Sequence, residues 1–402
     1  MRKGKGISLG PATLVAAAFI GPGTVVTASL AGANFGYALL WALVFSVLAT
    51  IILQEMAARL GVVTQQGLGE AIRRQVQNPL LRWGAMALII GAVIIGNSVY
   101  QGGNLTGASM GIAGVLGEQA AWLPLVLGIL AAALLWRGSY VLLERVLIAL
   151  VLLMSMTFVA TFLLVQPDWG AFFEGLLIPS LPTGSVLTVI ALIGTTVVPY
   201  NLFLHAASSA KKWQQPEQLS EARSDLWVSI PLGGLISVAI VSTAAAAFFG
   251  KALTIEGAAD LSESLRPLAG DWATWLMALG LFAAGLSSSI TAPLASAYAL
   301  SGILGRGGDL KGLPFRLTWM GIIAIGVIIA SLQIKPVTVI WFAQVANGLL
   351  LPIMALFLVW ACNHSMMGRY RNSWRQNLLA MLVVLVAVGL GVRSIGAALQ
   401  LW

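Results

Sequence analysis

The chain alternates between long apolar runs and short polar connections over its whole length of 402 residues. Most of these runs approach or exceed the roughly 20 residues that a helix needs to cross about 30 Å of hydrocarbon. The pattern therefore predicts an all-α polytopic membrane protein whose connections are too short to hold a soluble domain. We expect eleven transmembrane helices, at 8–32, 36–60, 81–104, 121–136, 140–165, 185–209, 226–250, 271–303, 316–333, 337–361 and 376–398.

Composition and charge support this class and predict an orientation. Charged residues make up 9% of the chain, against about 25% in soluble domains. The net charge of +8 reflects topology rather than a nucleic-acid partner, because an N-terminus inside leaves only Lys251, Arg266, Lys335 and Arg393 on the outer side. We expect an inner (plasma) membrane of bacterial type, the N-terminus inside, the C-terminus outside, lipid as the surroundings and no obligatory protein partner.

Two predicted helices, five apart in the order, are interrupted by proline in the same way. The first contains "FIGPGTVV" and the second "GTTVVPYNLFLH", residues 194–205. Proline inside a spanning helix removes a hydrogen bond, so backbone groups become free near the bilayer centre. Two unrelated kinks are one explanation, but matched breaks are typical of inverted-repeat transporters with the site between the repeats. We predict one transmembrane domain over 1–402, with repeats at 8–165 and 185–361 and an extra helix at 376–398.

At these residues the sequence resembles the Nramp (natural resistance-associated macrophage protein) family of divalent-metal transporters. Further ordered matches are "EMAARLGVVTQQGLGEAIR", "RGSYVLLERVL", "LGLFAAGLSSSITAPLASAYALSGIL" and "FAQVANGLLLPIMALFL". The resemblance implies a LeuT-type fold of five plus five inverted helices. It also implies a secondary transporter that works by alternating access, with its site between the broken helices one and six.

The resemblance also shows which metal ligands this chain lacks. Metal-transporting members have Asp-Pro-Gly-Asn at the first break, where this chain has "GPGT" at 21–24. The family's Met-Pro-His is replaced by "VPY" at 198–200, and an alanine whose carbonyl joins the site is replaced by Thr195. None of the family's divalent-metal side-chain ligands is present. Where the family has acids associated with proton movement the chain has Asn97 and Tyr100, and these residues together with the matching His205 are candidates for a gate or proton path.

The missing acids lead us to expect an anion as substrate. Only Glu55 and Glu144 lie inside predicted spans, both near the cytoplasmic end, and the other acids lie in loops or at helix ends. A divalent cation in a low-dielectric pocket needs anionic or strongly polar ligands. Two restarting helices would instead aim N–H groups and partial positive charge at the crossing point. We expect transport of a small inorganic anion, bicarbonate first. Expected substrate-binding residues are Gly21, Pro22, Gly23, Thr24, Thr195, Thr196, Val198, Pro199, Tyr200, Asn201, Gln344 and Asn347.

An anion in hydrocarbon also needs a compensating cation. LeuT-type folds hold sodium between helices one and eight, and here Ala284, Ser287 and Ser288 have the matching i, i+3, i+4 spacing. We therefore expect Na⁺ as coupling ion and no other cofactor. The alternative is that these small residues serve close helix packing.

Two other functions stay open. One is transport of a largely hydrated Mg²⁺ or Mn²⁺, with or without proton coupling. The other is a non-transporting Nramp-like receptor. An enzyme is not expected, because the sequence has neither a hydrolytic constellation nor a glycine-rich nucleotide loop after a strand.

Overall fold

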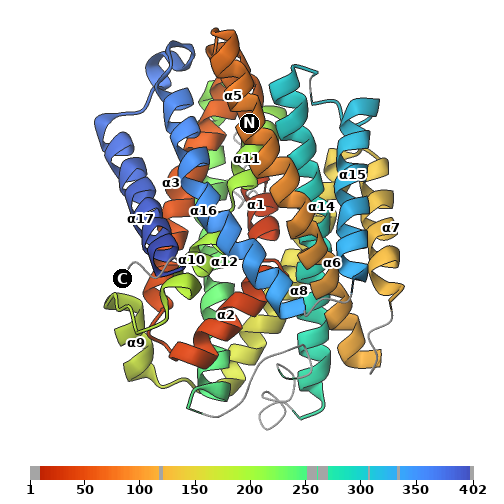
Figure 1. Cartoon of the computed structure of the whole chain (residues 1–402), viewed down its shortest axis with the longest axis vertical. Coiled ribbons are helices and arrows are strands. Elements are labelled where there is room, and N and C mark those ends of the chain that lie inside the picture. Colours follow the sequence, from red (N-terminus) through yellow and green to blue (C-terminus); the bar gives the residue numbers. More distant parts are fainter. Residues whose placement is uncertain are drawn as a thin grey trace, which may run out of the picture.

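The computed structural model describes residues 10–116, 121–250, 260, 270–306, 308–332 and 336–398, and the regular structure within these ranges is helical (Figure 1). Nine of the described helices are long and apolar enough to span a membrane. A bent pair, α1 (Pro11–Phe19) and α2 (Pro22–Phe35), makes ten, and α7 (Leu123–Trp136) is a shorter apolar helix. The predicted helical membrane class is confirmed. The count of eleven and the orientation stay predictions, and Lys251, Arg266, Lys335 and the Arg393 side chain lie outside the described residues.

Each predicted span coincides with a helix or a broken pair of helices. Short helices outside the predicted spans occupy the connections: α4 (Leu68–Gln75), α9 (Trp169–Leu177), η2 (Pro216–Gln218) and η3 (Ser365–Tyr370). The long elements are α3 (Leu40–Thr64), α5 (Pro79–Ile89), the π-helical η1 (Ile90–Ile95), α6 (Gly96–Leu116), α8 (Tyr140–Val165), α10 (Val186–Thr196), α11 (Pro199–Lys212), α12 (Leu219–Phe248), α14 (Trp272–Leu304), α15 (Leu313–Ser331), α16 (Pro336–Asn363) and α17 (Trp374–Ala398).

Two predicted boundaries are wrong for reasons of packing. The third span continues from 104 to Leu116, and glycines in this part of the helix allow close contact with other segments. A Cβ at Gly107 would lie 2.1 Å from the Pro22 side chain, and one at Gly111 would lie 2.6 Å from the Ala278 carbonyl oxygen. The seventh span begins at Leu219 rather than 226, because Leu219 packs into a small cluster with Trp213.

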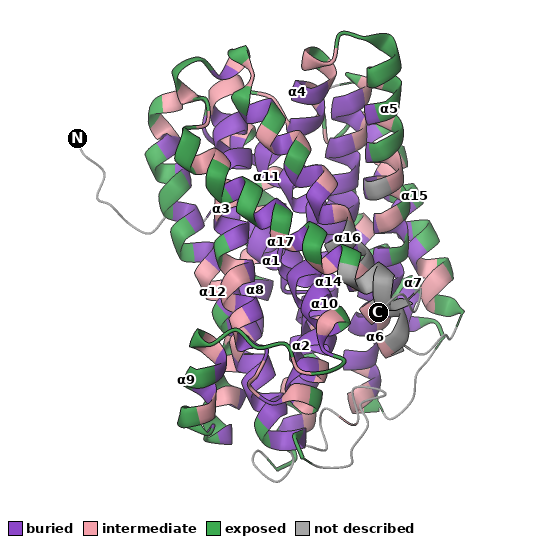
Figure 2. Cartoon of the chain, turned by 60° about the vertical axis from the view of Figure 1, so that its left-hand side comes forward, coloured by how far each residue is buried: buried purple, intermediate pink, exposed green. Residues whose placement is uncertain are grey.

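The broken helices form the centre of the molecule. All nine residues of α1 are buried, and α10 and α11 are buried along nearly their whole length (Figure 2). Helices α7, α15 and α17 lie at the periphery and expose apolar side chains (Figure 1). In a bilayer such exposure is ordinary, because acyl chains are as apolar as the side chains that face them. The fold thus encloses the two breaks within a ring of helices.

Both predicted breaks are present. Helix α1 ends at Phe19, and Ile20 and Gly21 leave helical geometry before Pro22 starts α2, so the pair is bent by 53°. Val197 and Val198 leave helical geometry in the same way before Pro199 starts α11. Proline is tolerated at the first position of a helix, where its missing N–H would have no helical partner. Each proline therefore starts a new helix in the interior.

Candidate functional site

The two breaks and α14 meet at the end of α1. The Ser287 hydroxyl donates to the Ala17 carbonyl oxygen at 3.0 Å, and the Ser288 hydroxyl donates to that of Ala18 at 3.2 Å. The Tyr200 hydroxyl, from the start of α11, donates to the same Ala18 oxygen at 3.5 Å. The last carbonyls of a helix have no intrahelical partner and carry its partial negative charge. A cluster of carbonyl and hydroxyl oxygens therefore lies at this crossing.

Glycine at the first break makes room for two neighbouring side chains. A Cβ at Gly21 would lie 2.5 Å from the Ser288 hydroxyl oxygen, and one at Gly23 would lie 1.9 Å from the Gln344 amide nitrogen. No real Cβ approaches that closely, so α14 and α16 reach the break only because both positions lack side chains. The first break thus contributes backbone and space, and its neighbours contribute the polar side chains.

Three buried amides at the crossing have unused hydrogen-bonding capacity. Asn201 is fully buried, and neither its amide oxygen nor its amide nitrogen has a partner. The same holds for the amide oxygen of Gln344, which is 1% exposed, and for the amide nitrogen of Asn347 on the same helix. An unsatisfied buried polar group costs about 1–3 kcal/mol and calls for an explanation such as a bound ion or water. These amides are the strongest ligand candidates.

An aromatic pair closes one side of the crossing. The rings of Tyr100 on α6 and Tyr200 on α11 meet edge to face with centroids 5.7 Å apart. The Tyr100 hydroxyl lies 3.6 Å from the position that a Cβ of Gly21 would occupy. Tyr100, predicted as a gate residue, therefore lies next to the first break.

Other predicted residues have their hydroxyl or amide protons engaged elsewhere. Thr195 and Thr196 donate to the Leu192 carbonyl oxygen of their own helix at 3.1 and 3.2 Å. The Thr24 hydroxyl donates to the Phe19 carbonyl, and the Asn97 amide donates to the Ser296 hydroxyl at 2.8 Å. The three threonines were expected to donate to an oxyanion, yet in this arrangement only their lone pairs are left for a ligand.

His205 is one turn beyond Asn201 on α11. Its Nδ1 lies 3.0 Å from the amide oxygen of Gln54 on α3, while its Nε2 has no partner and the side chain is fully buried. Sequence reasoning missed Gln54, although an amide in the apolar run "IILQEM" was a signal. A proton path through His205 stays a prediction.

The residues predicted to hold sodium do lie together. Ser287 donates to the Ala284 carbonyl oxygen at 3.0 Å as well as to Ala17, so one hydroxyl links α14 to the end of α1. This contact also explains the residues as close helix packing.

The two acidic residues inside the predicted spans form ion pairs away from the breaks. Glu55 pairs with Arg59 at 3.2 Å and with Arg223 at 2.8 Å, and Glu144 pairs with Lys212 at 2.8 Å. Over the described part of the chain, no group of three His, Cys, Asp or Glu side chains could hold a metal ion. The described groups found at the crossing, carbonyls, hydroxyls and amides, are uncharged.

Comparison with known proteins identifies the family. A family model described as "Natural resistance-associated macrophage protein-like" (Nramp) matches residues 12–397. The divalent metal cation transporters MntH of Yersinia pestis (strain Pestoides F) and Yersinia pseudotuberculosis (serotype O:1b) are each 30% identical over 404 residues, covering 97% of this chain and 95% of the relative. The chain belongs to the Nramp family. It is a multi-pass membrane protein of the bacterial-type inner membrane, and Nramp proteins are transporters.

Solved structures show the fold of this Nramp protein. A variant of the Eremococcus coleocola manganese transporter superposes with a TM-score of 0.79 at 22% identity, covering 96% of this chain and 86% of that one. The nucleobase-cation-symport transporter Mhp1 superposes with a TM-score of 0.58 at 16% identity, covering 97% and 93%. The predicted LeuT-type fold is confirmed.

The predicted substrate is wrong. The curated Nramp relatives are named divalent metal cation transporters, which contradicts bicarbonate or another small anion as substrate and, with it, sodium symport of that anion. The expectation of an anion rested on the two helix N-termini and on hydroxyl and amide groups acting as donors, and it took no helix C-terminus into account. Each break also holds the end of a helix, and the structure shows hydroxyls gathered at the carbonyls that end α1. Those carbonyls carry the opposite partial charge.

Proposed function

We propose that this Nramp protein transports a divalent metal cation by alternating access and has no enzymatic role. The observation that carries the proposal is the pair of buried amide oxygens, of Asn201 and Gln344, that accept no hydrogen bond. Gln344 lies beside Gly23 at the first break, and Asn201 directly follows Tyr200, whose hydroxyl donates to the Ala18 carbonyl near the end of α1. Helices α1, α11 and α16 therefore each bring uncharged oxygens to the region of the breaks. The names of the curated relatives support a divalent cation as the ion that these oxygens bind.

The uncharged ligand set favours an ion that keeps part of its water shell. Without a carboxylate at position 21, no full negative charge offsets the dehydration of a divalent ion. Mg²⁺ gives up water reluctantly and is usually bound with several waters retained. Amide and carbonyl oxygens can hold such an ion through direct contacts and through its waters.

The same ligands bear on selectivity. Val198 stands where the family has a methionine, so the soft thioether ligand is missing from the second break. Hard oxygen ligands suit Mg²⁺ and Mn²⁺, whereas soft sulfur favours softer metals such as Cu(I) and Zn²⁺. We propose that Mg²⁺ and Mn²⁺ compete for one site.

Uptake into proteoliposomes tests the proposal. We expect the full-length protein to admit Mg²⁺, reported by an enclosed indicator, and external Mn²⁺ to compete. Asn201→Ala removes an oxygen that meets the ion, and hydrogen bonds to charged groups contribute about 1.5–3 kcal/mol, so binding falls roughly tenfold to a hundredfold.

The control is Asn363→Ala, which removes an exposed amide bonded to Asn377, far along α16 from Gln344. It should transport like the parent. Liposomes that admit neither ion would overturn the proposal. Uptake that Asn201→Ala leaves unchanged would show that the ion binds elsewhere.

A further inference from the structure

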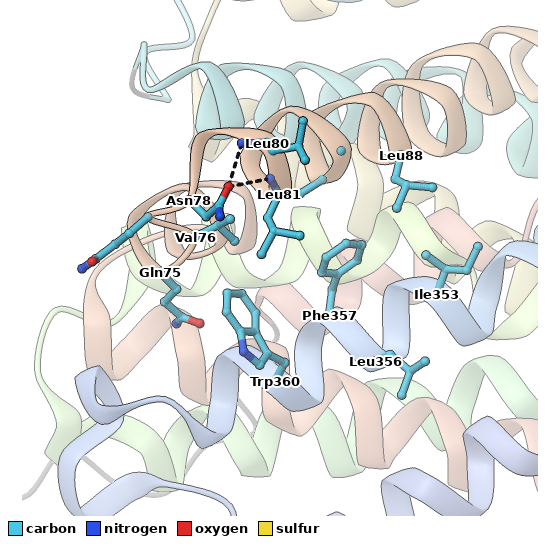
Figure 3. Close-up of a pocket in the computed structure, with 13 residues that line it drawn as sticks. Gln75, Val76, Asn78, Leu80, Leu81, Leu88, Ile353, Leu356, Phe357 and Trp360 are labelled. Carbon is cyan, nitrogen blue, oxygen red and sulfur yellow. Dashed lines mark hydrogen bonds between the residues drawn. The ribbon is translucent and has the colours of Figure 1, made fainter.

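A groove of about 670 Å³ opens on the membrane-facing surface between α5 and α16 (Figure 3). Its walls are apolar: Leu81 and Leu88 lie on the α5 side, and Phe357 and Trp360 lie on the α16 side. Leu81 is 65% exposed and Trp360 is 41% exposed. The volume falls within the roughly 300–1,000 Å³ of ligand sites. The groove is separate from the two breaks.

The groove has a polar end and an apolar length. Gln75, the last residue of α4, lines its polar end together with Gln77 and Asn78 from the connection to α5. The ten steps along the chain from Asn78 to Leu88 rise about 15 Å along a helix, which is half of a hydrocarbon core of about 30 Å. The groove therefore matches the depth of one leaflet, with its polar end at the headgroups. The charge pattern predicts this to be the cytoplasmic leaflet.

A fixed cation lies at the polar end. Arg82 Nε donates to the Val76 carbonyl oxygen at 3.1 Å, and its Nη2 donates to that of Gln77 at 3.5 Å. Both acceptors belong to residues that line the groove. Arg82 takes part in none of the ion pairs found among the described residues. Its positive charge is thus held at headgroup depth without a carboxylate to neutralise it.

From this juxtaposition we propose that the groove is a binding site for an anionic phospholipid. One acyl chain lies between α5 and α16, and the phosphate meets Arg82. Basic pockets between transmembrane helices bind anionic headgroups, and a basic residue near the surface contributes enough for about a fivefold preference. A zwitterionic lipid offers the same chains but no net negative charge, so the preference distinguishes a site from ordinary solvation by the bilayer.

The test counts lipids retained by the purified full-length protein in native mass spectrometry, without metal. Phosphatidylglycerol and phosphatidylcholine with identical acyl chains are compared. We expect phosphatidylglycerol to be retained preferentially, Arg82→Ala to lower that preference about fivefold, and Arg82→Lys to keep most of it. Arg145→Ala, an exposed arginine on α8, is the control and should behave as the parent.

A second variant fills the groove. Gly84 lines it, and a Cβ there would meet nothing within 4 Å, so the indole of Gly84→Trp has room to occupy the acyl-chain position. We expect this variant to retain no extra phosphatidylglycerol. Gly321→Trp, at an equally open glycine on α15, is the matched control.

Three results would overturn the lipid site. They are equal retention of both lipids by the parent protein, an unchanged preference for phosphatidylglycerol in Gly84→Trp, and a parent protein that is dimeric where Gly84→Trp is monomeric with its lipid count unchanged. The last would identify a second copy of the chain as the occupant. Should Gly84→Trp fail to fold, the parent protein is photolabelled with a phosphatidylglycerol that carries a photoreactive group at the end of one acyl chain. It should label the α5 or α16 segments of the groove and be displaced by phosphatidylglycerol but not by phosphatidylcholine; labelling elsewhere counts against the site.

Discussion

The two helix breaks begin with the same device, a proline that starts a new helix, yet they supply different chemistry. The first bends by 53° and has glycine on both sides of Pro22, so it presents backbone and lets neighbours approach. The second places Tyr200 and Asn201 directly after Pro199, so it presents side chains. In this chain one break provides carbonyls and space, and the other provides polar side chains that are candidate ligands.

The largest expected effect concerns the anchoring of the first broken helix. The N–H groups of Gly10 and Ala12 each donate to the Asp225 carboxylate at 2.9 Å, and Asp225 is 2% exposed. We expect Asp225→Ala to lower the free energy of unfolding by about 3 kcal/mol, because buried donors lose a charged acceptor. Thermal unfolding in detergent measures it. Asp168→Ala removes a similar but exposed cap from α9 and should lose only about 1 kcal/mol. Equal losses would contradict the anchoring role.

The next effect tests why the first break lacks a side chain. Gly21→Asp should cost about 1–3 kcal/mol of stability, because its Cβ would meet the Ser288 hydroxyl oxygen at 2.5 Å. Adding Ser288→Gly should restore stability and raise the affinity for Mn²⁺, because a carboxylate now faces the ion. Thermal unfolding and calorimetric titration with Mn²⁺ measure the two effects. A fully stable single variant would show that the break tolerates a side chain.

A smaller effect is expected at Gly23, where the first break lies against the side chain of Gln344. Gly23→Ala would push the Gln344 amide away, since the new Cβ would lie 1.9 Å from its nitrogen. We expect roughly tenfold weaker Mg²⁺ binding, as for the loss of a polar ligand to a charged group. In a double-mutant cycle with Gln344→Ala the losses should not add, because both variants remove the same contact. Additive losses of Mg²⁺ binding would show that Gly23 and Gln344 act independently.

The smallest effect is expected just before the second break. Thr195→Val and Thr196→Val remove hydroxyls that donate to the Leu192 carbonyl of their own helix, so Mg²⁺ uptake should change by less than about threefold. Uptake by the two variants, normalised to protein reconstituted, measures this. A tenfold loss of Mg²⁺ uptake would instead show that a threonine oxygen contacts the ion. The end of α10 would then contribute ligands as the start of α11 does.

Local signals in the sequence were enough for the spans and the breaks, and they failed where distant segments meet. Apolar runs placed the helices, and Pro22 and Pro199 marked both interruptions. The third helix extends past its predicted end at 104, and nothing nearby in the sequence shows that Gly107 packs on Pro22. The pairing of His205 with Gln54 was missed for the same reason, since the two are 151 positions apart.

The sign of the substrate charge shows how such a failure arises. The sequence has no acid at position 21, and the expectation of an anion rested on the N–H groups that begin α2 and α11 and on nearby hydroxyls and amides taken as donors. Which helix ends face the crossing depends on how α1, α11, α14 and α16 pack together. The unpaired oxygens of Asn201 and Gln344 became visible only in that packing.

By itself, the sequence determined the helical membrane class, the family, the two breaks and the absence of an acid at position 21, because hydropathy, proline and residue identity are local properties of the chain. The tertiary structure alone decided that carbonyls, hydroxyls and unpaired amides converge at those breaks, that Asp225 holds the start of α1, and that Arg82 lies at the end of a lipid-facing groove. These arrangements join residues far apart in the chain, and the packing of helices sets them.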